Sequence, residues 1–307
     1  MFAIAIHGGA GTLSRAGTSK EHELGYLAGL DAALDAGYSV LADSGSSLDA
    51  VTAAVVSLED NPLFNAGRGA VLTRDGLAEL DASIMEGGTL AAGAVCGLRH
   101  IRNPIGLARL VMERSPHVML VGEGAEEFAR AQGTELVSNE YFRTPIRQKQ
   151  LHRLLQGEAE KENDLLAHGG HYTGTVGAVA LDARGNVAAA TSTGGMTGKR
   201  WGRIGDSPII GAGTYASNAG CAVSATGHGE YFIRAVVAHD ISAQMQYAGL
   251  PLADSVSNTL ARMKALGGNG GVIAIAPSGE MVLDFNSEGM FRGARSSAGR
   301  REVAIHR

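Results

Sequence analysis

The sequence has 307 residues, of which 45% are hydrophobic, and this is enough to bury a large core. A formal net charge of −5, with no run of Lys and Arg interleaved with aromatic residues, argues against nucleic acid as a partner and favours a small molecule. No apolar run is long enough to cross a bilayer, and Met1–Gly11 lacks the basic region of a signal peptide, so we expect no membrane contact and a cytoplasmic protein.

The first elements alternate between strand and helix. A buried strand is predicted at Phe2–Ile6, and the glycine-rich turn His7–Gly11 follows it. Apolar residues at helical spacing predict a helix over Ser19–Leu41, for which the first residue is a suitable N-cap. Ser47 can cap a second helix in the same way, and that helix ends before Pro62.

From Ala70 the hydrophobic period changes to the period of two that is typical of strands. The elements predicted up to residue 132 are a hairpin over 70–85 with its turn at Asp75–Gly76, a strand at Ala91–Leu98, a helix at Pro104–Glu113, a strand at Val118–Val121 and a helix at Glu123–Gln132. Strands grouped in hairpins and helices grouped in pairs indicate helix layers on both faces of largely antiparallel sheets. We therefore expect one α/β domain over residues 1–307, folded as a four-layer αββα sandwich.

The apolar pattern ends between about Gln156 and Gly174. This segment is rich in Glu, Asn, Gly and other residues that carry too little apolar surface to offset the entropy lost on ordering. We expect a mobile linker that can be cut just before Thr175. An ordinary surface loop is the alternative that composition leaves open.

The second half of the chain begins with a predicted hairpin. Its strands are Val176–Leu181 and Val187–Thr191, joined by the turn Asp182–Asn186. Further on, the patterns predict helices over Gly227–Tyr247 and Ala253–Ala265, and a second hairpin over Gly270–Met290. Since the two hairpins are alike, we expect a sheet built twice over.

Thr175 and Thr193 lie at the open end of the first hairpin, so their hydroxyls should come close together. A threonine hydroxyl is a poor nucleophile unless a base lies within hydrogen-bond reach. If the chain is cut between Gly174 and Thr175, the new α-amino group, with a reference pKa of roughly 7.7 to 8.0, can be that base. Before the cut, the same hydroxyl can attack the carbonyl of Gly174. Threonines in a purely structural hairpin are the alternative.

Several stretches in the same order carry a resemblance to one family. They are I-H-G-G-A-G-T at 6–12, N-P-L-F-N-A-G-R-G at 61–69, G-T-V-G-A-V-A-L-D at 174–182, T-S-T-G-G-M-T at 191–197, G-R-I-G-D-S-P-I-I-G-A-G at 202–213 and T-G-H-G-E at 226–230. Together they resemble the plant-type asparaginases, or isoaspartyl aminopeptidases, of the N-terminal nucleophile (Ntn) hydrolase superfamily. The resemblance implies an autoprocessed amidohydrolase that acts on L-asparagine and on N-terminal isoaspartyl residues of dipeptides.

The resemblance also implies the roles of individual residues. Autocleavage at Gly174-Thr175 would give an α subunit of residues 1–174 and a β subunit of residues 175–307, which assemble as an (αβ)2 oligomer, a dimer of heterodimers. The implied site residues are the nucleophile Thr175, its hydrogen-bond partner Thr193, Asn65 to hold the nucleophile, Thr226 and Gly227 as the oxyanion hole, and Arg203 and Asp206 to bind the substrate α-carboxylate and α-ammonium. A guanidinium fork matches a carboxylate, and a carboxylate accepts from an ammonium, so this division is chemically sound.

No catalytic cofactor is expected. The family holds a structural sodium ion on backbone oxygens, and the matching residues here are Leu58, Glu59, Asn61, Phe64, Ala66 and Arg68. His228 stands where a threonine is usual in the family, and we expect it to alter the pocket wall. The spacing His228-Gly229-Glu230 is that of zinc deaminases, but no P-C-x-x-C accompanies it, and Cys96 and Cys221 are too isolated for a zinc site.

Two other functions remain open at this point. Glycosylasparaginase shares the fold and the nucleophile, although this sequence lacks the signal peptide and cysteine framework of a secreted or lysosomal enzyme. A non-catalytic binding protein on the same scaffold would have no need to keep Thr175, Thr193 and Arg203 together.

Overall fold

The computed structural model describes residues 1–11, 20–158 and 174–306. Within these ranges the strands form an eight-stranded sheet, in the order β12-β11-β1-β5-β6-β2-β3-β4, and a four-stranded sheet, in the order β10-β9-β8-β7. The strands of the larger sheet are β1 (Ala3–Gly11), β2 (Leu80–Glu86), β3 (Ala92–Leu98), β4 (Met119–Val121), β5 (Val176–Leu181), β6 (Val187–Thr193), β11 (Gly289–Ser296) and β12 (Arg301–Ala304). Those of the smaller sheet are β7 (Thr214–Ala216), β8 (Ala222–Gly227), β9 (Gly270–Ile275) and β10 (Met281–Phe285).

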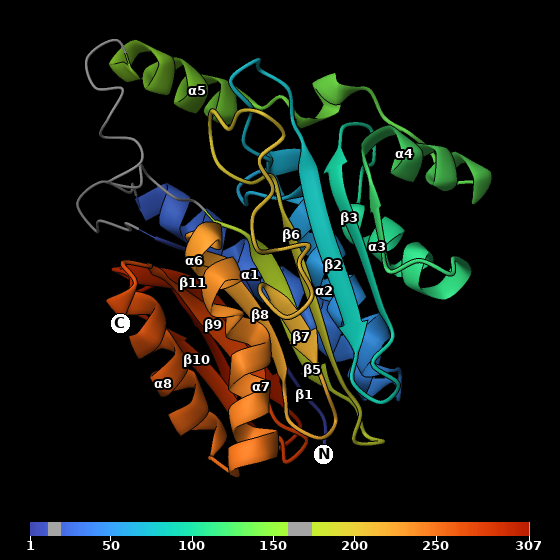
Figure 1. Ribbon diagram of the computed structural model, residues 1–307, viewed down its shortest axis with the longest axis vertical. Helices are drawn as coiled ribbons and strands as arrows, with labels where there is room; N and C mark the ends of the chain where they lie inside the picture. Colours follow the sequence, from blue (N-terminus) through green and yellow to red (C-terminus); the bar gives the residue numbers. More distant parts are fainter. Residues whose placement is uncertain (12–19, 159–173, 307) are drawn as a thin grey trace.

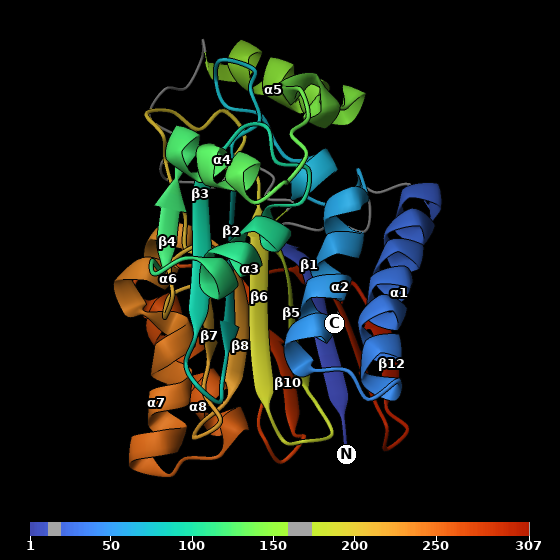
Figure 2. The ribbon, with the colours of Figure 1, turned by 90° about the vertical axis from the view of Figure 1, so that its right-hand side faces the viewer.

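Helices cover the outer face of each sheet. The larger sheet packs against α1 (Lys20–Ala42), α2 (Ser47–Asp60) and α3 (Pro104–Arg114), and the smaller sheet against α7 (Val237–Ala248) and α8 (Leu252–Ala265), with the short α6 (Gly229–Ala235) beside them. The remaining helices are α4 (Gly122–Ala131), α5 (Pro145–Glu158) and the 3-10 turns η1 (Gly67–Gly69) and η2 (Asn139–Phe142). Figures 1 and 2 show the four layers, which confirm the predicted αββα sandwich.

Three hydrophobic clusters separate the layers. One lies between α1 to α3 and the larger sheet, and another lies between the smaller sheet and its helices. The third fills the space between the two sheets and is built largely from small residues, such as Ala3, Ala189 and Ala222. Small side chains allow two sheets to approach closely, and the glycine- and alanine-rich composition follows from this packing.

The hairpin predicted over residues 176–191 is confirmed as β5 and β6. Its register pairs Val176 with Ser192 and Leu181 with Val187, so the open end of the hairpin carries Thr175 and Thr193. β6 pairs on its other side with β2, where Asp81 lies opposite Thr193. The central strands of the larger sheet thus bring polar residues from distant parts of the sequence to one end of the sheet.

Several predictions about single elements are wrong. The helix predicted over Gly227–Tyr247 is two helices, because Val236 adopts the left-handed conformation (φ 49, ψ 47) between α6 and α7, and Gly227 belongs to β8. The apolar stripe continues through this break, so periodicity alone could not reveal it. The predicted hairpin over 70–85 is a single bridge between Leu72 and Ala78 followed by β2.

Other elements were not predicted, namely α5, β7, β8, β11 and β12. Helix α5 continues to Glu158, so the linker predicted from about Gln156 begins later than expected. The rest of that linker, up to residue 173, and the predicted cap Ser19 lie outside the described residues. The two similar hairpins belong to different sheets, β5 and β6 to the larger and β9 and β10 to the smaller. In the described ranges, no helix is both long and apolar enough to pass through a membrane.

Candidate active site

The two threonines of the hairpin lie side by side. Thr175 Oγ1 donates a hydrogen bond to Thr193 Oγ1 over 3.1 Å, and both side chains are buried. Ser207 Oγ lies 3.4 Å from Thr175 Oγ1 on another side and donates to it. Sequence reasoning missed Ser207, although it follows the predicted Asp206 directly. The nucleophile candidate therefore has a hydroxyl acceptor and a hydroxyl donor around its own oxygen.

The turn after Thr193 is held by Asn65. The Asn65 side chain donates to the carbonyl of Gly195 over 2.8 Å and accepts from the amide of Val71 over 2.9 Å. The amide of Gly195 in turn donates to Thr193 Oγ1 over 3.0 Å. Asn65 thus contacts the turn that orients Thr193 rather than Thr175 itself, and its predicted support of the nucleophile is indirect.

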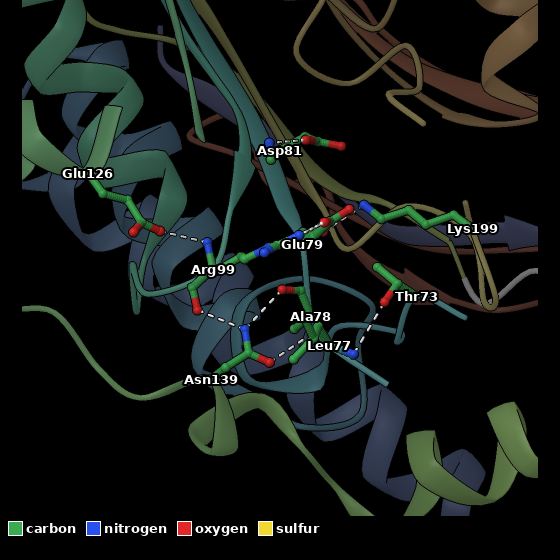
Figure 3. Close-up of polar contacts among 10 residues, drawn as sticks. Thr73, Leu77, Ala78, Glu79, Asp81, Arg99, Glu126, Asn139 and Lys199 are labelled. Atoms are coloured by element: carbon green, nitrogen blue, oxygen red, sulfur yellow. Dashed lines mark hydrogen bonds and ion pairs between the residues drawn. The ribbon is translucent and has the colours of Figure 1, made fainter. Parts of the chain in front are cut away.

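The side chain of Lys199 also packs against this turn. Its side chain is buried alongside Gly195, and Nζ donates to the main-chain carbonyl of Glu79 over 2.8 Å. Figure 3 shows the ammonium directed at Glu79, with the carboxylate of Asp81 nearby. Burial lowers the pKa of Lys199 and raises that of Asp81, and the attraction between their opposite charges acts against both shifts. No short motif signals Lys199, because its partners are distant in the sequence.

The bond predicted to break lies against Thr226. A Cβ on Gly174 would sit 2.6 Å from Thr226 Oγ1 and 3.2 Å from the Cα of Gly9, so only glycine fits there. The amide of Ala10 donates to Thr226 Oγ1 over 3.3 Å, which leaves the hydroxyl proton of Thr226 for another acceptor. Gly227 follows with φ +147, a conformation that suits glycine. Thr226 is therefore within reach of the Gly174 region, as an oxyanion-hole donor must be.

The predicted substrate clamp is partly occupied by a residue of the chain itself. Arg203 donates through Nε and Nη2 to both carboxylate oxygens of Glu230, over 2.8 and 2.9 Å. Burial acts to lower the pKa of Arg203, but the pair with Glu230 raises it, so the guanidinium stays charged. Glu230 lies in the T-G-H-G-E stretch, yet sequence reasoning gave it no role. A substrate carboxylate would have to bind at the edge of the guanidinium that Glu230 leaves open.

Asp206 lies across Gly229 from Arg203. A Cβ on Gly229 would be 2.9 Å from both Arg203 Nη2 and Asp206 Oδ1, so the glycine keeps the space between the two charges open. Asp206 is only 3% exposed, and its Oδ2 has no hydrogen-bond partner among the described residues. Burial raises the pKa of Asp206 to about 7, against the lowering effect of Arg203. A buried carboxylate oxygen without a partner is suited to receive an ammonium group.

Two further features border this region. His228 precedes α6, half-buried, with its ring centroid 5.7 Å from that of Tyr231. Burial lowers its pKa, which favours the neutral form of the ring, while the charge of Glu230 acts in the opposite direction. A cavity of about 420 Å³ opens beside Arg203 and Lys199, with Val121 and Ile204 among its apolar lining residues. Thr175 does not line this cavity.

The predicted sodium loop curls back on itself. A Cβ on Gly67 would lie 2.5 Å from the carbonyl oxygen of Glu59, and a Cβ on Gly69 would lie 2.1 Å from that of Phe64. The glycines thus let the main chain of the loop pack closely on itself, and the carbonyls of Leu58, Asn61 and Ala66 accept amide hydrogen bonds within it. A structural sodium ion on main-chain oxygens of the 58–68 loop stays a prediction from the resemblance.

The sequence is similar to one protein family and to several known proteins over most of its length. The profile of one protein family, described as Asparaginase, matches residues 1–305. The chain is 56% identical to the isoaspartyl peptidase of Escherichia coli (strain K12), over 94% of this chain and 91% of that protein. It is 44% identical to the probable isoaspartyl peptidase/L-asparaginase 2 of Arabidopsis thaliana, over 99% and 98%. It is 42% identical to the isoaspartyl peptidase/L-asparaginase of Homo sapiens, over 94% and 91%.

Proposed function

Because this chain belongs to the asparaginase family, we propose that it is an autoprocessed amidohydrolase. It hydrolyses L-asparagine to L-aspartate and ammonia, and it removes N-terminal isoaspartyl residues from dipeptides. The observation that carries this proposal is the contact of 3.1 Å between the hydroxyls of Thr175 and Thr193, directly after a glycine that has no room for a side chain. The names of the relatives favour this function over glycosylasparaginase and over a non-catalytic scaffold.

Self-cleavage comes first. Thr175 Oγ1 adds to the carbonyl carbon of Gly174, and the C–N bond of the peptide breaks as its nitrogen takes up the hydroxyl proton. The product is an ester between the two residues, which one water molecule hydrolyses to a carboxylate on Gly174 and a free hydroxyl on Thr175. The chain divides into residues 1–174 and 175–307, and Thr175 gains a free α-amino group.

Substrate hydrolysis uses the same hydroxyl. The α-amino group of Thr175 accepts the hydroxyl proton as Oγ1 attacks the side-chain carbonyl of the substrate, and it passes the proton to the departing amine. Water then hydrolyses the acyl-enzyme ester. Thr226 and Gly227 act as the oxyanion hole, and one such donor is worth roughly 3 to 4 kcal/mol in comparable sites. Thr193 accepts from the nucleophile and keeps it oriented.

The α-groups of the substrate select it. Arg203 binds the α-carboxylate beside Glu230, and the unpartnered oxygen of Asp206 receives the α-ammonium. The guanidinium plane of Arg203 is fixed before substrate arrives, because Glu230 holds it by two bonds. His228 precedes Gly229, the glycine between Arg203 and Asp206, and we expect it to influence the preference between asparagine and isoaspartyl dipeptides.

A substrate panel tests the function. Purified, cleaved enzyme should release ammonia from L-asparagine and hydrolyse β-aspartyl dipeptides, while α-aspartyl dipeptides stay intact. N-acetyl-asparagine should react slower by roughly a hundredfold or more, since a blocked amine leaves Asp206 buried without its partner. Equal rates of ammonia release from N-acetyl-asparagine and asparagine would show that Asp206 does not bind the α-ammonium. No hydrolysis of any of these substrates by the cleaved enzyme would refute the function itself.

Arg203→Ala tests the other half of the clamp. We expect KM for asparagine to rise about 10- to 150-fold, the equivalent of a charge-assisted hydrogen bond worth roughly 1.5 to 3 kcal/mol. Arg203→Lys should restore only part of the affinity, because a point charge cannot reproduce the fork. Arg99→Ala is the matched control, since Arg99 pairs with Glu79 at 2.7 Å on the edge of the same cavity. An unchanged KM in Arg203→Ala would place this residue outside the substrate site.

We further propose an ion, an oligomeric state and a cellular location for this protein. The sodium ion on the 58–68 loop and the association of two cleaved chains into an (αβ)2 oligomer follow from the resemblance to the family. We also propose a cytoplasmic location. These three statements stay predictions, and the absence of a catalytic cofactor is a fourth.

A further inference from the structure

A row of buried polar side chains crosses the space between the two sheets. Ser83 on β2 bonds to Thr214 on β7 (2.7 Å), which donates to Thr191 on β6 (2.5 Å). Thr191 bonds to Ser224 on β8 (2.7 Å), and Ser224 to Nε2 of His7 on β1 (2.8 Å). All five side chains have 0% exposure. Polar groups at such a depth destabilise the fold unless each finds a hydrogen-bond partner. Apolar side chains at the same positions would stabilise the fold at least as well, so stability alone does not account for this row.

The row ends on the backbone of the nucleophile. Nδ1 of His7 lies 3.0 Å from the main-chain carbonyl oxygen of Thr175. A carbonyl oxygen only accepts, so Nδ1 carries a proton. Burial lowers the pKa of His7 to about 3, and the ring is therefore neutral, with a lone pair on Nε2. Ser224 must donate to Nε2, and Thr191 in turn must donate to Ser224. The tautomer of one histidine fixes the direction of the adjoining hydroxyls.

The other end of the row, at Ser83, also leads to Thr175. Ser83 Oγ lies 2.6 Å from the main-chain carbonyl of Ser207, and the side chain of Ser207 donates to Thr175 Oγ1 over 3.4 Å. Ser83 has one hydroxyl proton, which either Thr214 Oγ1 or the carbonyl of Ser207 accepts, so this end of the row lies beside the residue that contacts the hydroxyl of Thr175. Gly177 makes room for it, because a Cβ there would lie 2.0 Å from Ser224 Oγ and 2.5 Å from His7 Nε2.

Thr175 needs such support because the sheet pairing ends before it. The register of β5 with β6 begins at Val176, and that of β5 with β1 stops at Gly177 opposite His7. After cleavage Thr175 is a chain terminus, and termini fray unless something holds them. The bond from His7 takes the place of the missing strand pairing.

We propose that His7 is a positioning residue for the nucleophile: the carbonyl of Thr175 fixes the proton on Nδ1, and Ser224, at the end of the row of hydroxyls, donates to Nε2. Its Nδ1–H holds the carbonyl of Thr175, so that Oγ1 stays directed first at Gly174 and later at the substrate. His7 touches neither substrate nor reacting atoms. Only the kinetic part of this inference rests on the proposed function.

Two substitutions of His7 test its bond to the carbonyl of Thr175 separately from its bond to Ser224. Asparagine places an amide near the Nδ1 position and can still donate to Thr175, whereas glutamine reaches the Nε2 position and cannot. We expect His7→Gln to lower kcat for asparagine roughly tenfold, the equivalent of one hydrogen bond, at unchanged KM. His7→Asn should lose clearly less. Equal kcat in all three proteins, or a greater loss in the asparagine variant, would overturn the proposal.

Serine variants supply a matched control. Ser224→Ala removes the donor to Nε2 and should lower kcat, while Ser255→Ala should not. Ser255 is equally buried, but its hydroxyl donates to the carbonyl of Pro251, the N-cap of the outer helix α8. A loss of melting temperature without a loss of kcat in Ser224→Ala would mean that the row is only structural, and would overturn the kinetic role.

A spectroscopic readout does not depend on activity or on any variant. In the wild-type protein labelled with ¹⁵N-histidine, His7 should show a protonated Nδ1 and an unprotonated Nε2, unchanged from about pH 5 to 8. A signal of the opposite tautomer, or titration near the ordinary histidine pKa of roughly 6.5, would overturn the assignment even if the enzyme proved fully active. If the tautomer is as expected but asparagine is not hydrolysed, the proposed function fails and the network stands.

Discussion

Thr175→Ala is expected to leave the chain in one piece and to abolish hydrolysis of asparagine. The variant lacks the only atom that can attack Gly174 in the proposed scheme, and the uncut chain has no α-amino base at residue 175. Loss of a nucleophile of this kind lowers turnover on the order of a thousandfold or more. Intact-mass measurement should show one species for the variant and, for the wild type, two fragments that begin at Met1 and at Thr175.

Thr175→Ser is the control for this result. Serine keeps the hydroxyl, and Thr193 Oγ1 at 3.1 Å can still accept from it, so cleavage should continue. The alanine variant should remain folded, since the methyl group and hydroxyl that it loses are small and lie at the end of β5. Splitting of Thr175→Ala between residues 174 and 175 would remove the nucleophile assignment, whatever the activity.

The part of the site that sequence could predict is the part built from local geometry. The hairpin pattern alone places Thr175 opposite Thr193, because antiparallel pairing over a short turn fixes which residues face each other. Layer architecture also follows from the alternation of strand and helix patterns. These inferences need only neighbours in the chain, and the structure confirms them.

Residues that act through distant partners could not be found in this way. His7 meets Ser224 at a sequence separation of 217, and Lys199 meets the carbonyl of Glu79 at 120. A lone histidine and a lone lysine give no pattern, and only the packing of two sheets brings their partners together. For the same reason the pair of Arg203 with Glu230 escaped notice, although both residues lie in quoted motifs.

The failed predictions of elements have a related cause. Periodicity predicts a helix wherever apolar residues recur at helical spacing, and α6 and α7 keep that spacing on either side of Val236. A β-branched residue in the left-handed region is strained, and tertiary contacts must hold it there. Strand β11 and the edge strand β12 were missed because their sequence is mixed, with Arg295 of one paired with Arg301 of the other.

Asp206→Asn should separate stability from activity. Burial raises the pKa of Asp206 from 3.8 to about 7 in the folded protein, so between these values the native state binds more protons than the unfolded state. Stability from this group is therefore present at low pH and lost as pH rises from about 4 to about 7. Asparagine cannot ionise, so the variant should melt at a higher temperature than wild type at pH 8, by a margin that shrinks towards pH 5.

The same substitution should lower kcat/KM for asparagine roughly a hundredfold or more at pH 8, because a neutral amide does not attract the α-ammonium. In wild type, kcat/KM should fall as pH drops below about 7, where Asp206 takes up a proton, and the α-amino base of Thr175 adds to this fall. Asp43→Asn is the control, since Asp43 is exposed beyond α1 and should change neither melting nor rate. If Asp206→Asn melted below wild type at pH 8, the carboxylate would have a buried partner and would not be available to bind the substrate α-ammonium. If the rate stayed within a few-fold of wild type, another group would bind the ammonium.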